Sequence, residues 1–209
     1  MPPKFTNYGV CALCGQRVTK TKMLAHLPAC AAAHDEAGAP QPLVVLRFGQ
    51  AGDRRYWLIV EAKADAPLRH VDKLLRQVWL ECCGHMSAFR VGRRELAMTT
   101  ATASAFAFAA SKVDYEYDFG STTALIGELV GTRLGSLGRE SVRLLARNEP
   151  ILWSCGECEA PATLVCPFCI DYGDTVFCDA HAAAHEHADE EVYLPVVNSP
   201  RMGVCGYTG

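Results

Sequence analysis

The C-terminal quarter of the chain carries cysteines and histidines at spacings that are typical of metal ligands. Four short motifs follow one another: Cys155-x2-Cys158, Cys166-x2-Cys169, Cys178-x2-His181 and His185-x-His187. Thiolate sulfur and imidazole nitrogen are the usual ligands of tetrahedral zinc, so these eight side chains are enough for two sites. The sequence therefore predicts that structural zinc holds this segment together.

The order of these motifs resembles a B-box-type cross-brace, in which the first and third pairs hold one metal and the second and fourth pairs hold another. The two predicted sites are then Cys155, Cys158, Cys178 and His181, and Cys166, Cys169, His185 and His187. A single residue between two histidines is a short spacing for ligands on a helix, so Asp189, Cys205 or a water could replace His187. A site with three protein ligands could be catalytic, because an open position lets zinc activate water. A closed structural site is the favoured hypothesis.

A further metal-ligand pattern lies near the N-terminus, where Cys11-x2-Cys14 is followed by His26-x3-Cys30. Residues 23–29 are predicted to form a short helix, which places His26 and Cys30 on one side at positions i and i+4. This C2HC pattern predicts a zinc knuckle and brings the expected total to three zinc ions. The loop between the ligand pairs is basic and polar, so its lysines either contact phosphates or are simply solvated.

Charge is distributed unevenly along the chain. Residues 1–34 carry four basic side chains and no acid, whereas residues 151–209 carry nine acids against one arginine. Because a nucleic-acid footprint needs clustered Lys or Arg, only the N-terminal segment has a suitable sign. Its basic residues are Lys4, Arg17, Lys20 and Lys22.

The composition limits the class of protein. The chain has 209 residues, half of them hydrophobic, and eleven cysteines. It contains no run of about 18 apolar residues that would cross a membrane, and its N-terminus lacks an apolar signal-peptide core. We therefore expect a cytoplasmic protein with no membrane partner, in which a reducing environment favours metal binding over disulfides.

The middle segment, residues 43–150, must supply the hydrophobic core. Strands are predicted at residues 43–48, 56–64, 85–91, 112–119, 123–130 and 140–147. A helix is predicted from Pro67 to about Leu80, where apolar residues recur on one face, with Gly84 placed to end it. Residues 101–110 are ambiguous between a helix and a buried strand. This pattern predicts an α+β fold with a mostly antiparallel sheet and one main helix, flanked by two small zinc modules.

The predicted strand at residues 112–119 alternates in polarity. Its apolar side chains, expected together on one face, are Val113, Tyr115, Tyr117 and Phe119. The motif Tyr115-Glu116-Tyr117-Asp118-Phe119-Gly120, together with the preceding strand and helix, resembles the pRiA4b ORF-3-like family, also called the IS1096 element passenger TnpR family. Ser87-Ala88 and Ser121-Thr122-Thr123 depart from that family's pattern. The resemblance covers about half of the chain and implies a shared α+β fold and an association with plasmids and mobile elements. It implies no activity.

The expected organisation has four parts: a C2HC zinc knuckle at 1–34, a linker at 35–42, a pRiA4b ORF-3-like α+β domain at 43–150, and a two-zinc module with a tail at 151–209. Other candidate chemistry is weaker. Asp118-Phe119-Gly120 matches the kinase metal-binding tripeptide, but no other kinase motif accompanies it. Cys82 and Cys83 are interpreted as small buried hydrophobic residues that end a helix, and His85 as a histidine at the edge of the core.

Three functional hypotheses follow. The favoured one is a zinc-binding, non-enzymatic interaction or adaptor protein with a protein partner. The alternatives are a nucleic-acid-binding accessory protein of a mobile element, acting through the basic N-terminal finger, and an enzyme that depends on an open zinc site or a cleft in the core. The sequence names no catalytic residue, no cofactor other than zinc and no oligomeric state.

Overall fold

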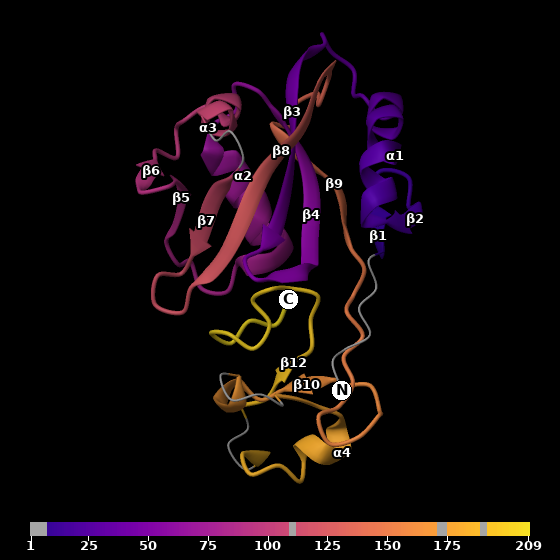
Figure 1. The fold of residues 1–209 in the computed structure, drawn as a ribbon, viewed down its shortest axis with the longest axis vertical. Coiled ribbons are helices and arrows are strands. Elements are labelled where there is room, and N and C mark those ends of the chain that lie inside the picture. Colours follow the sequence, from indigo (N-terminus) through magenta and orange to yellow (C-terminus); the bar gives the residue numbers. More distant parts are fainter. Residues whose placement is uncertain (1–7, 109–111, 171–174, 189–191) are drawn as a thin grey trace.

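The computed structural model describes residues 8–108, 112–170, 175–188 and 192–209. Within them, an antiparallel sheet of nine strands forms the body of the molecule, and a smaller three-stranded sheet lies near the C-terminus (Figure 1). The large sheet has the spatial order β2 (Arg17–Thr19), β1 (Tyr8–Cys11), β9 (Val142–Asn148), β4 (Asp53–Lys63), β3 (Gln41–Gln50), β8 (Thr123–Gly135), β7 (Val113–Tyr117), β5 (Ser87–Val91) and β6 (Arg94–Leu96). The predicted α+β class with a mostly antiparallel sheet is confirmed.

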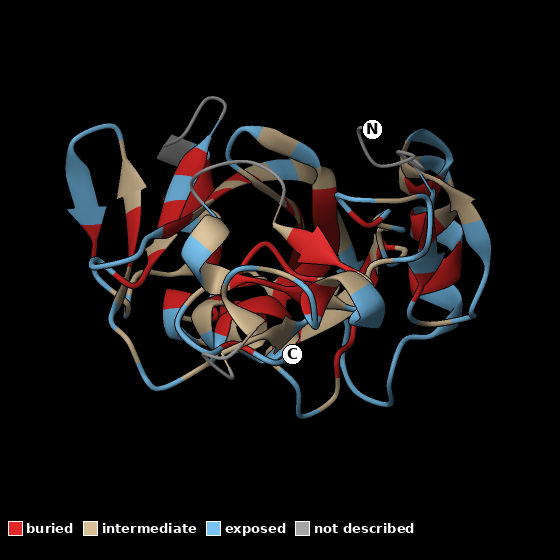
Figure 2. Ribbon diagram, turned by 90° about the horizontal axis from the view of Figure 1, so that it is seen from below, coloured by how far each residue is buried: buried red, intermediate tan, exposed pale blue. Residues whose placement is uncertain are grey.

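Helices cover both faces of this sheet. Helix α1 (Lys20–Ala33) lies on one face, and α2 (Leu68–Leu75) and α3 (Thr102–Phe108) lie on the other (Figure 1). Along β4, Leu58 and Val60 pack toward α2, whereas Trp57 and Ile59 pack toward α1. Because β4 is buried on both faces, its sequence is a nearly continuous apolar run that begins at Tyr56. Figure 2 shows the buried residues gathered in the interior and the exposed residues along the outer loops.

The helices differ from the prediction in their lengths. The helix expected from Pro67 to about Leu80 is an α-helix only as far as Leu75, and Arg76–Leu80 form a π-helical turn. The wider turn brings Trp79 and Leu80 together into the core, where both are fully buried. Helix α1 has 14 residues and is therefore longer than α2, which has eight.

Strand β7 ends earlier than expected, and one prediction for it was wrong. Phe119 does not share the buried face of Val113, Tyr115 and Tyr117, because its side chain is 48% exposed. The reason is Asp118, whose φ of +63° turns the chain and whose carboxylate accepts a hydrogen bond from the amide of Gly120 at 3.0 Å. Of the ambiguous segment 101–110, residues 102–108 form helix α3, and residues 109–110 lie outside the described residues.

The expected N-terminal knuckle is continuous with the large sheet. Strand β1 pairs with β9 through Gly9–Asn148, Val10–Arg147 and Cys11–Ala146. In the segment expected to be a linker, Asp35 accepts hydrogen bonds from Arg133, the shorter at 2.8 Å, and β3 already begins at Gln41. Among the described residues, no helix is both long enough and apolar enough to cross a membrane.

The C-terminal part divides into a module and a tail. The C-terminal module (residues 151–195) contains β10 (Leu164–Val165), a 3-10 turn (Pro167–Cys169), β11 (Val176–Phe177), α4 (Asp179–Ala182) and β12 (Leu194–Pro195). The C-terminal tail (residues 196–209) then returns to the core, where the side-chain amide of Asn148 donates to that of Asn198 at 2.8 Å. Asn198 donates in turn to the carbonyl of Asn148 at 3.0 Å, so the chain leaves and re-enters the core at one place.

Candidate metal centres

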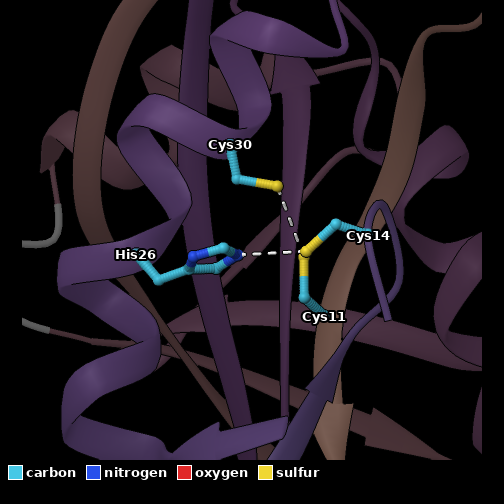
Figure 3. Close-up of side chains that lie close together, drawn as sticks. All are labelled: Cys11, Cys14, His26 and Cys30. Atoms are coloured by element: carbon cyan, nitrogen blue, oxygen red, sulfur yellow. Dashed lines mark hydrogen bonds between the residues drawn. The ribbon is translucent and has the colours of Figure 1, made fainter. Parts of the chain in front are cut away.

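The four predicted N-terminal ligands lie together beside the large sheet. Figure 3 shows Cys11 and Cys14 on the strand and turn, pointing toward His26 and Cys30 on helix α1. The Sγ atoms of Cys11 and Cys30 are 3.7 Å apart, and Cys14 Sγ lies 3.4 Å from His26 Nε2. In a tetrahedral zinc site, bonds of about 2.3 Å to sulfur and about 2.0 Å to nitrogen put neighbouring ligand atoms about 3.5–3.8 Å apart. The observed separations match that geometry.

Local structure explains the position of each N-terminal ligand. After β1, the chain makes a tight turn in which Gly15, with a φ of +74°, donates its amide to the carbonyl of Cys11 at 2.9 Å. Helix α1 begins at Lys20, and the hydroxyl of the preceding Thr19 caps it by accepting a hydrogen bond from the amide of Lys22. Met23 and Leu27 bury the inner face of α1 against Trp57 and Ile59 of β4, and this packing aims the ligand side of the helix at the turn.

A buried ion network fixes the other end of helix α1. Glu61 on β4 is fully buried and accepts hydrogen bonds from Arg133 at 2.8 Å and from Arg143 at 2.5 Å. Arg143 also donates to the carbonyls of Ala31 at 3.1 Å and His34 at 2.6 Å, which satisfies the free end of the helix. Cys30 lies in this last turn, so the network helps to place it.

The environments of the N-terminal thiols are unequal. The pKa of Cys30 is raised to about 12, chiefly by burial and further by the neighbouring thiols of Cys14 and Cys11. The pKa of Cys14, by contrast, is lowered, first by a hydrogen bond from the backbone of Gln16. Thiols packed this closely resist joint ionisation, because each thiolate repels the next, and a bound cation removes that repulsion.

In the C-terminal module, the first predicted group comes together around His181. Its Nδ1 atom lies 3.5 Å from Cys155 Sγ and 3.3 Å from Cys178 Sγ, and the Sγ atoms of Cys158 and Cys178 are 4.0 Å apart. Although burial opposes it, hydrogen bonds from the backbone of Cys178 and Glu157 lower the pKa of Cys155 to about 6. Such a thiol is ready to act as a thiolate ligand.

The second group in the module includes His187, the predicted ligand for which the sequence left alternatives. His187 Nδ1 lies 3.4 Å from Cys166 Sγ and 3.5 Å from Cys169 Sγ, and His185 Nε2 is 3.3 Å from both Cys169 Sγ and His187 Nδ1. Two aromatic rings orient these imidazoles: Phe177 lies 4.5 Å from His185 and Phe168 lies 5.1 Å from His187, measured between ring centres.

The spatial grouping is that of the expected cross-brace, with the first and third pairs together and the second and fourth pairs together. Of the alternatives to His187, Cys205 lies in a different cluster and Asp189 is outside the described residues. The structure thus assembles each of the three predicted sets of four side chains, with ligand atoms within 4.8 Å of one another. These clusters are compatible with metal binding, and the identity and number of the ions stay a prediction.

A fourth cluster was missed by the sequence reasoning: Cys82, Cys83, His85 and Cys205 also bring their ligand atoms within 4.8 Å. The interpretation of both cysteines as buried hydrophobic residues was wrong, because Cys83 is exposed and Cys82 is only partly buried. The helix ends at Leu80, so both cysteines lie on the loop beyond it. A count of residues could have revealed the cluster, since three of the eleven cysteines are left over from the predicted sites.

Comparison with known proteins assigns no function. No family model and no curated protein matches the chain. Among solved structures, the chain is similar to a protein of unknown function, MM3350 from Methanosarcina mazei Go1, with 14% sequence identity and a TM-score of 0.42. That likeness covers 74% of this chain and 89% of the other. At this level the likeness carries no argument about function.

Proposed function

We propose that this protein is a zinc-stabilised interaction protein without catalytic chemistry of its own. The observation that carries the proposal is the composition of the three predicted clusters, each of which offers four Cys or His side chains at tetrahedral separations. Zinc that is held by four protein ligands keeps no open position for water or substrate, which is typical of structural sites. Such sites build a surface for binding and do not activate a nucleophile.

The charge of the C-terminal module indicates the kind of partner. Arg201 is the one basic residue in 151–209, but its side chain is fully buried and paired with Asp118 at 2.6 Å. Glu157, Glu159 and Glu186, by contrast, are exposed. A surface with acids and no exposed Lys or Arg repels phosphates and attracts a basic protein surface. We therefore propose a basic protein partner for the module.

A second candidate function, binding of nucleic acid or another phosphate-bearing ligand, has one specific observation in its favour. Lys20, Arg54 and Lys112 line a pocket of about 620 Å³ at one end of β3 and β4, with Arg47 beside them. Burial lowers the pKa of Lys20, and the charges of Arg47 and Arg54 lower it further. Lys20 and Arg54 have no ion-pair partner among the described residues, so an anion would relieve their repulsion.

Charge reversal separates the two candidates. One variant combines Glu157→Lys with Glu159→Lys, and the matched variant combines Lys20→Glu with Arg54→Glu. We expect polylysine, as a basic probe, to bind the wild type and to lose affinity for the first variant only, as measured by fluorescence anisotropy at several salt concentrations. Duplex DNA that binds the wild type with a steep salt dependence, and fails to bind the second variant, would instead support the phosphate-binding candidate.

Metal content tests the zinc assignment directly. Native mass spectrometry of the full chain should find one zinc ion for each of the three predicted clusters. Replacing Cys14, Cys158 or Cys169 by serine should remove one ion in each case. The affected cluster then keeps only three of the four strong ligands that a structural zinc site needs. A C-terminal module that folds without zinc, or an unchanged zinc content in all three variants, would overturn the assignment.

We also propose that the chain belongs to the pRiA4b ORF-3-like family. The motif from Tyr115 to Gly120 supports membership of the pRiA4b ORF-3-like family, and with it an association with plasmids and mobile elements. The antiparallel α+β fold of the surrounding segment is compatible with that membership. On this view, the zinc-binding segments are additions that adapt the shared domain to a partner.

A further inference from the structure

The cluster of Cys82, Cys83, His85 and Cys205 joins parts of the chain that are far apart in sequence. Three of its members lie on the loop after the π-helical turn, and the fourth lies in the C-terminal tail, 120 residues beyond His85. Its four ligand atoms all lie within 4.8 Å of one another, as they do in the three predicted clusters. Cys83 Sγ lies 2.9 Å from His85 Nε2, 3.6 Å from Cys205 Sγ and 3.8 Å from Cys82 Sγ, and His85 Nε2 lies 3.2 Å from Cys205 Sγ.

The groups around this cluster are those that commonly support a metal site. While His85 turns its Nε2 atom toward the sulfurs, its Nδ1 atom lies 3.6 Å from the carboxylate of Asp118. A carboxylate behind the imidazole fixes the orientation of a metal-bound histidine and raises its basicity. Cys82 Sγ lies 3.6 Å from the guanidinium of Arg201 and 3.8 Å from the hydroxyl of Tyr117, both of which can donate to a thiolate.

Backbone geometry points to the same place. Among the described residues, only Asp118 and Cys205 have a positive φ without being glycine, at +63° and +53°. Such conformations are unfavourable for residues other than glycine and persist where surrounding contacts require them, often at binding sites. The two exceptions lie on either side of His85. One of them carries a sulfur of the cluster and the other carries the carboxylate behind the imidazole.

Hydrogen bonds of Ser199 and Arg201 attach the tail to the core close to the cluster. Arg201 is fully buried, and its guanidinium donates to the carbonyl of Ser121 at 2.7 Å and to Asp118 at 2.6 Å. The backbone amide of Arg201 is held by the hydroxyl of Ser199, which in turn donates to the carbonyl of Trp79 at 2.5 Å. Cys205 follows four residues after this anchor, so its position beside Cys83 does not depend on a loose chain end.

We propose that Cys82, Cys83, His85 and Cys205 form a fourth zinc site, which clamps the C-terminal tail to the core. Three thiolates and one imidazole favour zinc over harder divalent ions such as magnesium or calcium. Because Cys83 and Cys205 are exposed, zinc can reach the site in the folded protein. The site joins residues 82–85 of the core to Cys205 of the tail, which follows the C-terminal module. It therefore attaches the C-terminal side of the module to the core.

Native mass spectrometry of the zinc-loaded full chain tests this proposal. We expect four zinc ions in the wild type and three in the Cys205→Ser variant. Cys14→Ser is the matched control, because it removes a thiol from the N-terminal cluster and should also leave three ions. Alkylation by iodoacetamide tells the two variants apart: Cys83 should be slow to react in the wild type and in Cys14→Ser, and fast in Cys205→Ser.

The outcomes that would overturn the proposal are distinct. Equal zinc content in the wild type and Cys205→Ser, together with loss of one ion in Cys14→Ser, would exclude the fourth site and leave the other three. A wild-type mass lower by two hydrogen atoms, with Cys83 and Cys205 linked in the peptide map, would show a disulfide in place of the metal. If neither variant loses zinc, the proposed function fails together with this site.

Discussion

Glu61 carries its charge in the interior of the protein, where a carboxylate is tolerated only if its hydrogen bonds are satisfied. Its partners Arg133 and Arg143 come from β8 and β9, so one carboxylate on β4 ties three strands together. Arg143 extends this connection to the end of α1. A buried ion pair adds little net stability compared with apolar packing, but removing one partner leaves the others uncompensated.

Replacement of Glu61 by glutamine should therefore destabilise the protein strongly. We expect a loss of about 3–5 kcal/mol in the free energy of unfolding, because Arg133 and Arg143 lose the buried carboxylate that both contact and keep Asp35 alone as an acidic partner. The measurement is urea unfolding in the presence of zinc. Glu128→Gln is the control, since the Arg47–Glu128 pair is partly exposed and its loss should cost about 0–1 kcal/mol. Similar losses in both variants would contradict this account.

Asp35 gives the stability a defined pH dependence. A hydrogen bond from Arg133 lowers the pKa of Asp35, and the backbone amide of Ser136 adds to the effect. A carboxyl group whose pKa is lower in the folded state stabilises the protein above its ordinary pKa of about 3.9, and this contribution is lost as the pH falls through the folded value. The difference in unfolding free energy between the wild type and Asp35→Asn should thus be largest near neutral pH and vanish in acid. A constant difference would contradict the prediction.

The two kinds of site residue differ in how well they could be predicted. The CxxC pairs and the i, i+4 pair of His26 and Cys30 are local patterns, so the sequence alone indicated their chemistry. Cys205 contributes to a cluster with partners 120 and 122 residues away, and no spacing rule covers that distance. The ion network of Glu61 could not be predicted for another reason. One acidic residue in an apolar run does not indicate which arginines will pair with it.

At the scale of elements, helix α1 shows why the N-terminal site depends on the core. Although β1 has only four residues, it pairs with β9, and α1 packs across the strands next to it. The sequence predicted part of the helix, and the structure places His26 and Cys30 on it. The sequence could not predict the pairing with β9, because such a short strand has no register signal of its own and its partner lies more than a hundred residues away.

Truncation of Met23 tests this dependence. Its side chain is fully buried between α1 and the sheet, so Met23→Ala should cost about 2–5 kcal/mol in the free energy of unfolding. The same change should weaken zinc binding at the N-terminal cluster, because the helix loses its fixed distance from the turn. Titration with a competing chelator measures this. Lys22→Ala, at an exposed neighbouring position, should change stability by no more than about 0.5 kcal/mol.

At the scale of the whole molecule, the two sheets differ in what stabilises them. The large sheet has an extensive hydrophobic core on its α2 face, whereas the buried cluster of the C-terminal module consists of Cys155, Cys166, Phe177 and Ala182. Two of these four residues are predicted metal ligands. A core this small cannot offset the conformational entropy of the segment, so under the proposed zinc assignment the metal supplies most of its folding free energy.

Chelation should accordingly unfold one part of the molecule and leave the other folded. On addition of EDTA, hydrogen exchange followed by mass spectrometry should show loss of protection across residues 155–170 and 175–188 in a single cooperative step. Strands β3, β4 and β8 should keep their protection, since apolar packing holds them. Protection that persists in the module after all zinc is removed would refute the structural role of the metal.

The paired amides of Asn148 and Asn198 have a consequence for how this chain can be rearranged. Since the polypeptide departs and returns at these two residues, the segment between them has the geometry of a cassette. Such a segment can be excised and its ends rejoined by a short link without crossing any other part of the protein. A chain shortened in this way should retain the tail, its arginine anchor and the strand order of the large sheet. The acidic cassette could then be grafted onto another scaffold or exchanged for a different one.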